Sequence, residues 1–450
     1  MAAYETSLNG SFIVHRAGGV IRQTIWARRV RSAVVSLNVP VLGGRSVMLT
    51  VDEHSLRLAK NLRFPPDLVA LLFETFGLEK CEKILRCLKT PPPIYYLRVN
   101  TLLTDRDEVI GKLEELGIRA IPHPQLEEAI GIPVEGPFGI EPCKKKVVAD
   151  KLACESVMIG ADLYAPGVIT AKGVRKGDKV MVVDKHGEHV ASGVALMDAG
   201  EMHSLRKGVA VKVTESLYKV PSIRGTPIYK EGHVYEQSLP AILTSRVLDP
   251  KPGDLVVDMC AAPGGKTTHI AQLMQGLGLV LAFDRSKSRA QKLKDHVMRM
   301  KLKNIIVEIK NSLFLDVEYP SLKADAVLID PPCSDLGLRP KLYEEKNVSM
   351  IWAAANYQRQ LLKVAARILK LGGMLVYSTC TITAEENEEN VEFCVDELGF
   401  EVENQPLYLG DRGLKGFRNA EMVQRFFPDT HGTPGFFIAK MRKVNEKEGR

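Results

Sequence analysis

The chain has 450 residues, of which 45% are hydrophobic and 26% are charged, and its formal net charge at pH 7 is +7. This length allows two or three domains with cores of their own, and the composition is that of an ordinary soluble protein. No apolar run reaches the ~20 residues of a membrane-spanning helix, and no N-terminal stretch has the order of a secretory signal. Composition therefore excludes a membrane-embedded or a secreted protein.

Cysteine usage points to a reducing compartment. The eight cysteines are spread too thinly for a disulfide framework, and no pair has the spacing of zinc ligands; they lie at positions 81, 87, 143, 154, 260, 333, 380 and 394. We therefore expect a cytoplasmic protein without a resident metal centre, in which most cysteines are small apolar core residues.

The first 47 residues differ from the rest. They contain six arginines, no lysine and a single acid, Glu5. Such a segment is typical of a basic RNA-binding arm or of a transit peptide, or it is untranslated sequence ahead of a start at Met48, which we favour. Because this segment supplies most of the excess positive charge, net charge alone does not establish nucleic-acid binding.

Residues 48–145 are expected to form a small α/β module. An apolar-periodic run at Asp67–Phe76 follows two prolines and predicts a helix. A strand-like run follows at Ile94–Asn100, and Thr104 with Asp107 indicates a capping box for a second helix.

Residues 146–220 change to short alternating runs such as Lys179–Asp184 and Gly208–Val213, separated by regularly spaced glycines. This pattern predicts a compact, mostly β domain, and a plain spacer is the alternative.

Residues 221–450 alternate short apolar strands with helices. The predicted strands are Leu255–Met259, Val280–Asp284, Ile305–Lys310, Ala326–Asp330 and Met374–Ser378, and the predicted helices are Lys266–Met274, Ser286–Leu302 and Asn356–Leu371. Such alternation predicts a Rossmann-like α/β domain, with a mostly parallel sheet covered on both faces. Ligands in such sheets bind beyond the carboxyl ends of the strands, where the chemical motifs of this chain fall.

The first motif, Asp258–Thr267, passes from a strand through a glycine turn into a helix. Small residues let a ligand approach the backbone, and the helix N-terminus favours an anionic group. Gly265-Lys266-Thr267 is similar to the end of a P-loop, but Cys260 stands where that loop requires its first glycine. An NTPase is therefore a minor alternative to the binding of a nucleoside cofactor.

Asp284 supports the nucleoside cofactor. It ends the next predicted strand about 20 residues further on, where an acid accepts both ribose hydroxyls of such a cofactor. The alternative is a helix N-cap for the run beginning near Ser286.

Two cysteines follow two other predicted strands. Asp330-Pro-Pro-Cys333-Ser contains a rigid turn, and Ser378-Thr-Cys380 ends the fifth strand. A thiolate that adds to C6 of cytosine makes C5 reactive toward a methyl donor, an acid such as Asp330 stabilises the developing charge, and a second cysteine assists release. Chemistry alone does not say which cysteine has which role.

These motifs, in this order and spacing and together with Arg98-Val-Asn100, resemble the NSUN family of RNA cytosine-5 methyltransferases over residues 52–443. The resemblance implies that Cys380 is the nucleophile, that Cys333 promotes product release and that Lys266 assists catalysis. It also implies S-adenosyl-L-methionine as cofactor, contacted by Cys260, Ala261, Ala262, Pro263, Gly264, Gly265, Lys266, Asp284, Asn311 and Asp330. At Asn311 the family usually has aspartate; an amide oxygen still accepts a hydrogen bond from adenine, so we expect a modest loss of affinity.

Residues 160–168 are similar to the signature of PUA domains, which bind structured RNA. A PUA domain at this place resembles the sixth NSUN branch. That likeness implies methylation of position 72 in the tRNA acceptor stem, with the PUA domain holding the CCA end, by an enzyme expected to be a monomer. Methylation of rRNA, and an RNA-binding assembly factor with a vestigial centre, remain the alternatives. Candidate phosphate contacts are Lys144–Lys146, Arg175, Lys176, Arg206 and Lys207.

Overall fold

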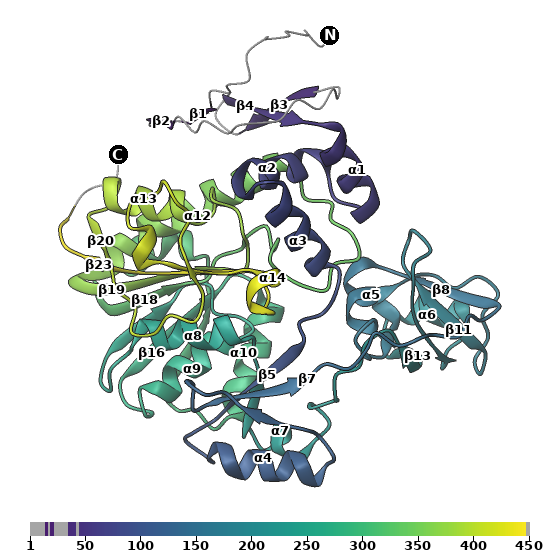
Figure 1. The fold of residues 1–450 in the computed structure, drawn as a ribbon. Coiled ribbons are helices and arrows are strands. Elements are labelled where there is room, and N and C mark those ends of the chain that lie inside the picture. Colours follow the sequence, from purple (N-terminus) through teal and green to yellow (C-terminus); the bar gives the residue numbers. More distant parts are fainter. Residues whose placement is uncertain (1–13, 17–18, 22–34, 42–44, 447–450) are drawn as a thin grey trace.

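The computed structural model describes residues 14–16, 19–21, 35–41 and 45–446 (Figure 1). Most of the segment 1–47 lies outside these residues, so the three interpretations of that segment stay open. Its described parts form antiparallel pairs between β1 (Val14–Arg16) and β2 (Gly19–Ile21), and between β3 (Val35–Val41) and β4 (Arg45–Val51).

Three helices follow, namely α1 (Glu53–Leu62), α2 (Pro66–Phe76) and α3 (Leu78–Leu88). The prediction of a helix at Asp67–Phe76 is confirmed. Asp67 also accepts a hydrogen bond from the backbone N–H of Val348, and the three helices share an apolar core with Ile351 and Phe427. These helices therefore pack against the C-terminal domain and share a hydrophobic core with it.

The N-terminal module is a four-stranded sheet in the order β14-β5-β7-β6, flanked by short helices. Its elements are β5 (Ile94–Val99), α4 (Arg106–Glu115), β6 (Ile121–Pro122), β7 (Ala129–Pro133), α7 (Pro227–Lys230) and β14 (Val234–Glu236). Asp105 caps α4 by accepting from the N–H of Glu108 at 2.8 Å, so the predicted cap at Thr104 was one residue off.

One boundary differs from the expected division at residue 221. β14 pairs antiparallel with β5, and Ile223, Ile228 and Val234 pack in the core of the N-terminal module. The segment 223–236 therefore completes this module, and the mostly β domain is inserted between its strands β7 and β14.

The inserted domain is a six-stranded sheet in the order β10-β8-β11-β12-β13-β9, which stands to one side of the molecule (Figure 1). Its elements are β8 (Lys145–Ala149), α5 (Lys151–Val157), β9 (Leu163–Tyr164), β10 (Val168–Thr170), β11 (Lys179–Val183), β12 (His189–Ala195), α6 (Ala199–Leu205) and β13 (Val209–Ser216). The predicted mostly β character is confirmed, and alternate valines of its strands fill a core to which Leu342 and Tyr343 of the C-terminal domain also contribute.

The C-terminal domain has the predicted parallel sheet. Its strand order is β17-β16-β15-β18-β19-β23-β22-β21, with β20 also paired to β23, and the first five strands are parallel. The strands are β15 (Leu255–Asp258), β16 (Leu279–Asp284), β17 (Ile305–Ile309), β18 (Ala324–Ile329), β19 (Leu369–Thr379), β20 (Phe400–Glu403), β21 (Asp411–Arg412), β22 (Gln424–Phe426) and β23 (Phe436–Lys443).

Helices cover both faces of this sheet because its strands are apolar on both sides. Val257 and Val327 face the helices α12 (Val348–Ile368) and α13 (Glu388–Glu397), whereas Val256 and Leu328 face the other layer. That layer consists of α8 (Leu239–Leu248), α9 (Gly265–Leu273) and α10 (Lys287–Arg299). A short helix, α14 (Pro428–His431), precedes β23, and α11 (Leu315–Glu318) precedes β18.

The helix predicted to begin at Asn356 begins at Val348. Asn347 caps it by accepting from the N–H of Met350 at 3.1 Å, and this cap fixes the earlier start. No helix in the described ranges is long and apolar enough to cross a membrane.

Candidate active site

Four neighbouring parallel strands deliver the sequence motifs to one edge of the sheet. At their carboxyl ends lie, in order of the chain, Asp258, Asp284, Asp330 and Cys380. β15 stands beside both β16 and β18, and β18 stands beside β19. The predicted residues therefore meet at the place where ligands bind in open parallel sheets.

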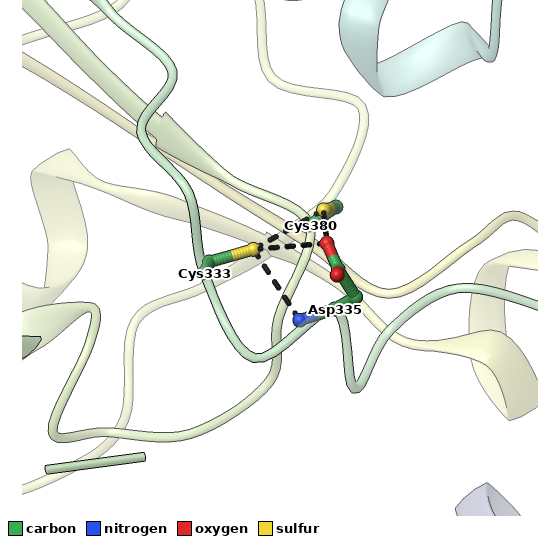
Figure 2. Close-up of side chains that lie close together, drawn as sticks. All are labelled: Cys333, Asp335 and Cys380. Carbon is green, nitrogen blue, oxygen red and sulfur yellow. Dashed lines mark hydrogen bonds between the residues drawn. The ribbon is translucent and has the colours of Figure 1, made fainter. Parts of the chain in front are cut away.

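Cys333 and Cys380 point toward one another across the turn that follows β18 (Figure 2). Their sulfurs are 3.2 Å apart, and both side chains are partly exposed. A third group, the Oδ1 atom of Asp335, lies 3.1 Å from Sγ of Cys380 and 3.5 Å from Sγ of Cys333. The two cysteines that the sequence singled out thus form one cluster with an aspartate that it did not.

Asp335 was missed because its position depends on the fold of a turn. Its backbone has a φ of 55°, in the left-handed region that few non-glycine residues adopt, and this conformation returns its side chain to the sulfurs. The available signal was an acidic residue only two positions after Cys333.

A buried carboxylate holds this turn in place. Glu386, which follows Cys380 in the chain, accepts a hydrogen bond from the N–H of Ser334 at 2.8 Å and another from Gln358 at 3.0 Å. Burial raises the pKa of Glu386. The hydrogen bonds that this carboxylate accepts lower its pKa, but by less than burial raises it. The loops that carry the two cysteines are therefore tied to each other and to α12.

The electrostatics of the cluster keep Cys380 protonated in the free protein. Its hydrogen bond with Cys333, burial and the nearby carboxylates together raise the pKa of Cys380 well above its usual value. Burial also acts on Asp335, but the ion pair with Lys346 at 2.9 Å and the bond from Cys380 outweigh it and lower the pKa of this carboxyl. Asp335 is accordingly a carboxylate placed to accept a proton or a hydrogen bond from the thiol.

Lys266 and Asp330, also predicted from the sequence, form an ion pair beside the cysteines. Nζ of Lys266 lies 2.6 Å from Oδ2 of Asp330, and the hydroxyl of Ser378 donates to Oδ1 at 2.9 Å. Both oxygens of Asp330 are thereby fixed in direction. A carboxylate and an ammonium group held this way can exchange a proton with the polar edge of a base.

The glycine turn between β15 and α9 is built for close approach. Gly264 has a φ of +113°, and a Cβ atom there would lie 2.4 Å from Leu293. Asp258 anchors the turn by accepting from the hydroxyl of Thr267 at 2.7 Å and from the N–H of Cys260 at 3.3 Å. Burial raises the pKa of Asp258 to about 6. The N–H groups at the start of α9 are thus presented at the sheet edge.

Asp284 does not cap the next helix. Ser286 is the N-cap of α10, whereas Asp284 accepts from the N–H groups of Ser286 at 2.8 Å and of Ala262 at 3.3 Å. The alternative reading of Asp284 as a helix cap is therefore wrong. The carboxylate joins the end of β16 to the glycine turn.

Asn311 follows the outermost parallel strand, β17. Its Oδ1 atom accepts from the N–H of Leu313 at 3.3 Å and caps a short 3₁₀ turn at Ser312–Phe314. The side chain is partly exposed.

An open cavity of about 220 Å³ lies beside Cys333. It is lined by Arg285, Pro332, Cys333, Ala354 and Tyr357. Its wall thus includes Arg285, the residue after Asp284 in the chain, and Cys333. A carboxylate suited to a ribose diol and a positive helix end suited to an acid group, both at this edge of the sheet, match the chemistry of an amino-acid nucleoside.

Comparisons with known proteins agree with this geometry. The family described as 16S rRNA methyltransferase RsmB/F matches residues 245–442, the PUA domain matches residues 145–217, and the ferredoxin-like domain of RsmF/B-like methyltransferases matches residues 64–138.

Two curated relatives are similar over nearly their full length. A tRNA (cytosine(72)-C(5))-methyltransferase from Pyrococcus horikoshii is 43% identical over 388 residues, which cover 85% of this chain and 98% of the relative. The human tRNA (cytosine(72)-C(5))-methyltransferase NSUN6 is 30% identical over 426 residues, which cover 85% and 90%. The chain belongs to the NSUN family of RNA cytosine-5 methyltransferases.

Solved structures place the fold in the same family. The crystal structure of NSun6 from Pyrococcus horikoshii with SFG has a TM-score of 0.78 and 43% identity, and it covers 85% of this chain and 99% of its own. The predictions of a Rossmann-like class I methyltransferase domain, an inserted PUA domain, an α/β N-terminal module and S-adenosylmethionine as cofactor are confirmed.

Proposed function

We propose that this NSUN enzyme transfers a methyl group from S-adenosylmethionine to C5 of cytosine at position 72 of the tRNA acceptor stem. Relatives with that activity in their names are similar over 85% of the chain, and the PUA domain matches residues 145–217. The observation that carries the proposal is the pair of sulfurs of Cys333 and Cys380, 3.2 Å apart at the carboxyl edge of the sheet.

The glycine turn and Asp284 are the proposed cofactor contacts. Asp284 binds the ribose hydroxyls, and the N-terminus of α9, which begins at Gly265, binds the amino-acid carboxylate. S-adenosylmethionine supplies, when bound, an electrophilic methyl group. Asn311, on the outer strand, keeps the proposed contact with adenine because an amide oxygen accepts two hydrogen bonds, one of which Leu313 already uses.

Cys380 is the proposed nucleophile. Its proton passes to Oδ1 of Asp335, 3.1 Å away, while the sulfur forms a bond to C6 of the cytosine and the electron pair of the C5–C6 double bond moves toward C5 and the ring. The ammonium group of Lys266 passes a proton through Asp330 to N3, which neutralises the negative charge that the addition places on the ring.

Cys333 acts after C5 has received the methyl group. Its sulfur takes the C5 proton, the electrons of that C–H bond restore the double bond, and the bond between C6 and Sγ of Cys380 breaks. The short distance between the two sulfurs makes this transfer possible in the same site. Without Cys333 the adduct should form and persist.

The test uses purified protein, labelled S-adenosylmethionine and two tRNA transcripts that differ only in cytosine or uridine at position 72. We expect label in the first transcript and none in the second. Cys380→Ala should abolish incorporation, and Cys333→Ala should give a tRNA–protein adduct that survives a denaturing gel. Equal label in both transcripts would show that the methylated nucleotide is not position 72. An adduct formed by Cys380→Ala would show that Cys333 is the nucleophile and Cys380 the release residue.

Ribosomal RNA is the competing substrate, because the matched catalytic-domain family is described by that activity. The same assay with rRNA transcripts decides between the two. An assembly factor without activity would incorporate no label in either RNA.

The PUA domain is proposed to hold the CCA end, with Lys144, Lys146, Lys176 and Lys207 as exposed phosphate contacts. Arg206 is less available, because it donates hydrogen bonds to the backbone oxygens of Val168 and Pro166. We further propose that the enzyme acts as a monomer in the cytoplasm, and that methyl transfer itself uses no metal. Sedimentation of the enzyme with and without tRNA tests the oligomeric state.

A further inference from the structure

We propose that Cys333, Asp335 and Cys380 form an inhibitory binding site for Zn²⁺. Among the residues that the structure describes, this is the cluster of potential metal ligands whose donor atoms all lie within 4.8 Å of one another. Two thiolates and one carboxylate are ligands of the kind that Zn²⁺ takes from proteins, and the soft sulfurs exclude Mg²⁺ and Ca²⁺.

The spacing of the three donor atoms is close to that of a tetrahedral zinc site. Bond lengths of about 2.3 Å to sulfur and 2.0 Å to oxygen place two sulfurs about 3.8 Å apart and a sulfur about 3.5 Å from an oxygen. Here the sulfurs are 3.2 Å apart, and Oδ1 of Asp335 lies 3.5 Å and 3.1 Å from them (Figure 2). One distance matches, and the other two need to widen by about half an ångström, which a rotation of either thiol supplies.

The surroundings complete the coordination. Lys346 binds the other oxygen of Asp335 at 2.9 Å and the carbonyl of Ser334 at 2.6 Å, so Oδ1 stays directed at the sulfurs. The cavity of about 220 Å³ that ends at Cys333 gives the ion a path from solvent and leaves room for water as the fourth ligand.

Charge also favours the bound ion. The two thiol protons pass to the buffer when Zn²⁺ binds, and no electron is transferred. The resulting two thiolates, Asp335, Lys346 and the divalent ion sum to zero net charge, while Asp330 is already neutralised by Lys266. The site therefore holds the ion without a large uncompensated charge.

The consequence for the enzyme rests on the proposed function. Zn²⁺ bound to Sγ of Cys380 lowers the nucleophilicity of that sulfur and occupies the space through which C6 of cytosine must approach, so the ion and the RNA base compete for the site. Methylation should stop at one Zn²⁺ per chain and return when a chelator removes it.

The experiment measures metal binding on the full-length, RNA-free protein, with Co²⁺ as the spectroscopic probe. We expect thiolate-to-cobalt charge-transfer absorption and tetrahedral ligand-field bands that saturate at one ion per chain and disappear on addition of Zn²⁺. Cys333→Ala and Cys380→Ala should each roughly halve the charge-transfer intensity, and the double variant should remove it. Lys346→Met should weaken binding about 10- to 100-fold without altering the spectrum.

Cys143→Ser is the matched control, because Cys143 is another partly exposed cysteine and lies just before β8, the first strand of the inserted domain. Its spectrum should equal that of the wild type. No charge-transfer band in the wild type, or a band that survives in the double variant, would overturn the zinc site. The cobalt spectrum needs neither RNA nor methyl transfer. A negative result would therefore reject the zinc site without bearing on the proposed methyltransferase activity.

Discussion

Only one of the two thiols, Cys333 or Cys380, should lose its proton over the alkaline pH range in which the protein stays folded. Two thiolates with sulfurs 3.2 Å apart repel each other by about 5 kcal/mol at an effective dielectric constant of about 20. This energy reduces the doubly ionised population by more than about 10³-fold relative to two independent thiols. The bond to Cys333, burial and the carboxylates nearby raise the pKa of Cys380 and act in the same direction.

The perturbation is the removal of either sulfur, and the assay is a spectroscopic titration. Wild type, Cys333→Ala, Cys380→Ala and the double variant are titrated by the ultraviolet absorbance of thiolate, and the double variant supplies the background of the six other cysteines. We expect wild type to exceed this background by no more than one thiolate. Each single variant should reach the same amplitude, because the remaining thiol no longer has an ionised neighbour.

An amplitude of two thiolates in the wild type, equal to the sum of the single variants, would refute the reasoning. It would mean that the sulfurs are farther apart in solution, or that a cation lies between them. If one proton is retained, the sulfur that does not attack is still protonated when the adduct forms. Because Asp335 already carries the proton of Cys380, Cys333 must then lose its own proton to solvent before it can act on C5.

Three further predictions follow from buried or paired charges. Lys266→Met removes the partner of Asp330 and should lower the rate of methyl incorporation about 100-fold or more, with little change in melting temperature. A rate within threefold of wild type would show that Lys266 takes no part in catalysis. Arg425→Met leaves the buried carboxylate of Glu388 without its cation and should cost about 3–5 kcal/mol in denaturant unfolding, part of which Glu388→Gln in the same chain recovers. Burial lowers the pKa of His269 to about 4 from an ordinary ~6.5, so the unfolded state binds the proton first, and unfolding free energy should fall by about 2 kcal/mol between pH 6.5 and pH 5. His269→Leu should flatten that slope, and an unchanged slope would assign it to other groups.

The sequence predicted the catalytic domain well because its strands are apolar on both faces and therefore easily located. Each of the five predicted parallel strands was found, although β19 begins at Leu369, five residues before the predicted Met374. The glycine turn at residues 258–267 was predicted correctly because the strand, the turn and the helix are contiguous in the chain. Features formed by neighbouring residues can be predicted from the sequence alone.

Non-local arrangements were not predictable in the same way. β14 joins a sheet whose other strands precede the inserted domain, and nothing in Val234–Glu236 itself indicates a partner near residue 98. The place of Asp335 depends on the left-handed backbone of one residue and on Glu386, about 50 residues away, which holds the turn. The predicted strands place the two cysteines at one edge of the sheet. The position of Asp335, the third member of the cluster, depends on the conformation of the loops, which the sequence did not predict.

Arg98 shows how the N-terminal module takes part in the catalytic centre. Its guanidinium is fully buried and donates to Oε1 of Gln237 and to the hydroxyl of Thr268, both at 2.8 Å, and to the carbonyl of Gly265. Burial lowers its pKa to about 9, and its hydrogen-bond acceptors, which also include Sδ of Met300, are neutral. A charge buried at this cost joins a strand of the module to the first turn of α9, where Lys266 lies. The module and the glycine turn are therefore one hydrogen-bonded unit, so an RNA bound to the module would lie in fixed register with the proposed catalytic residues.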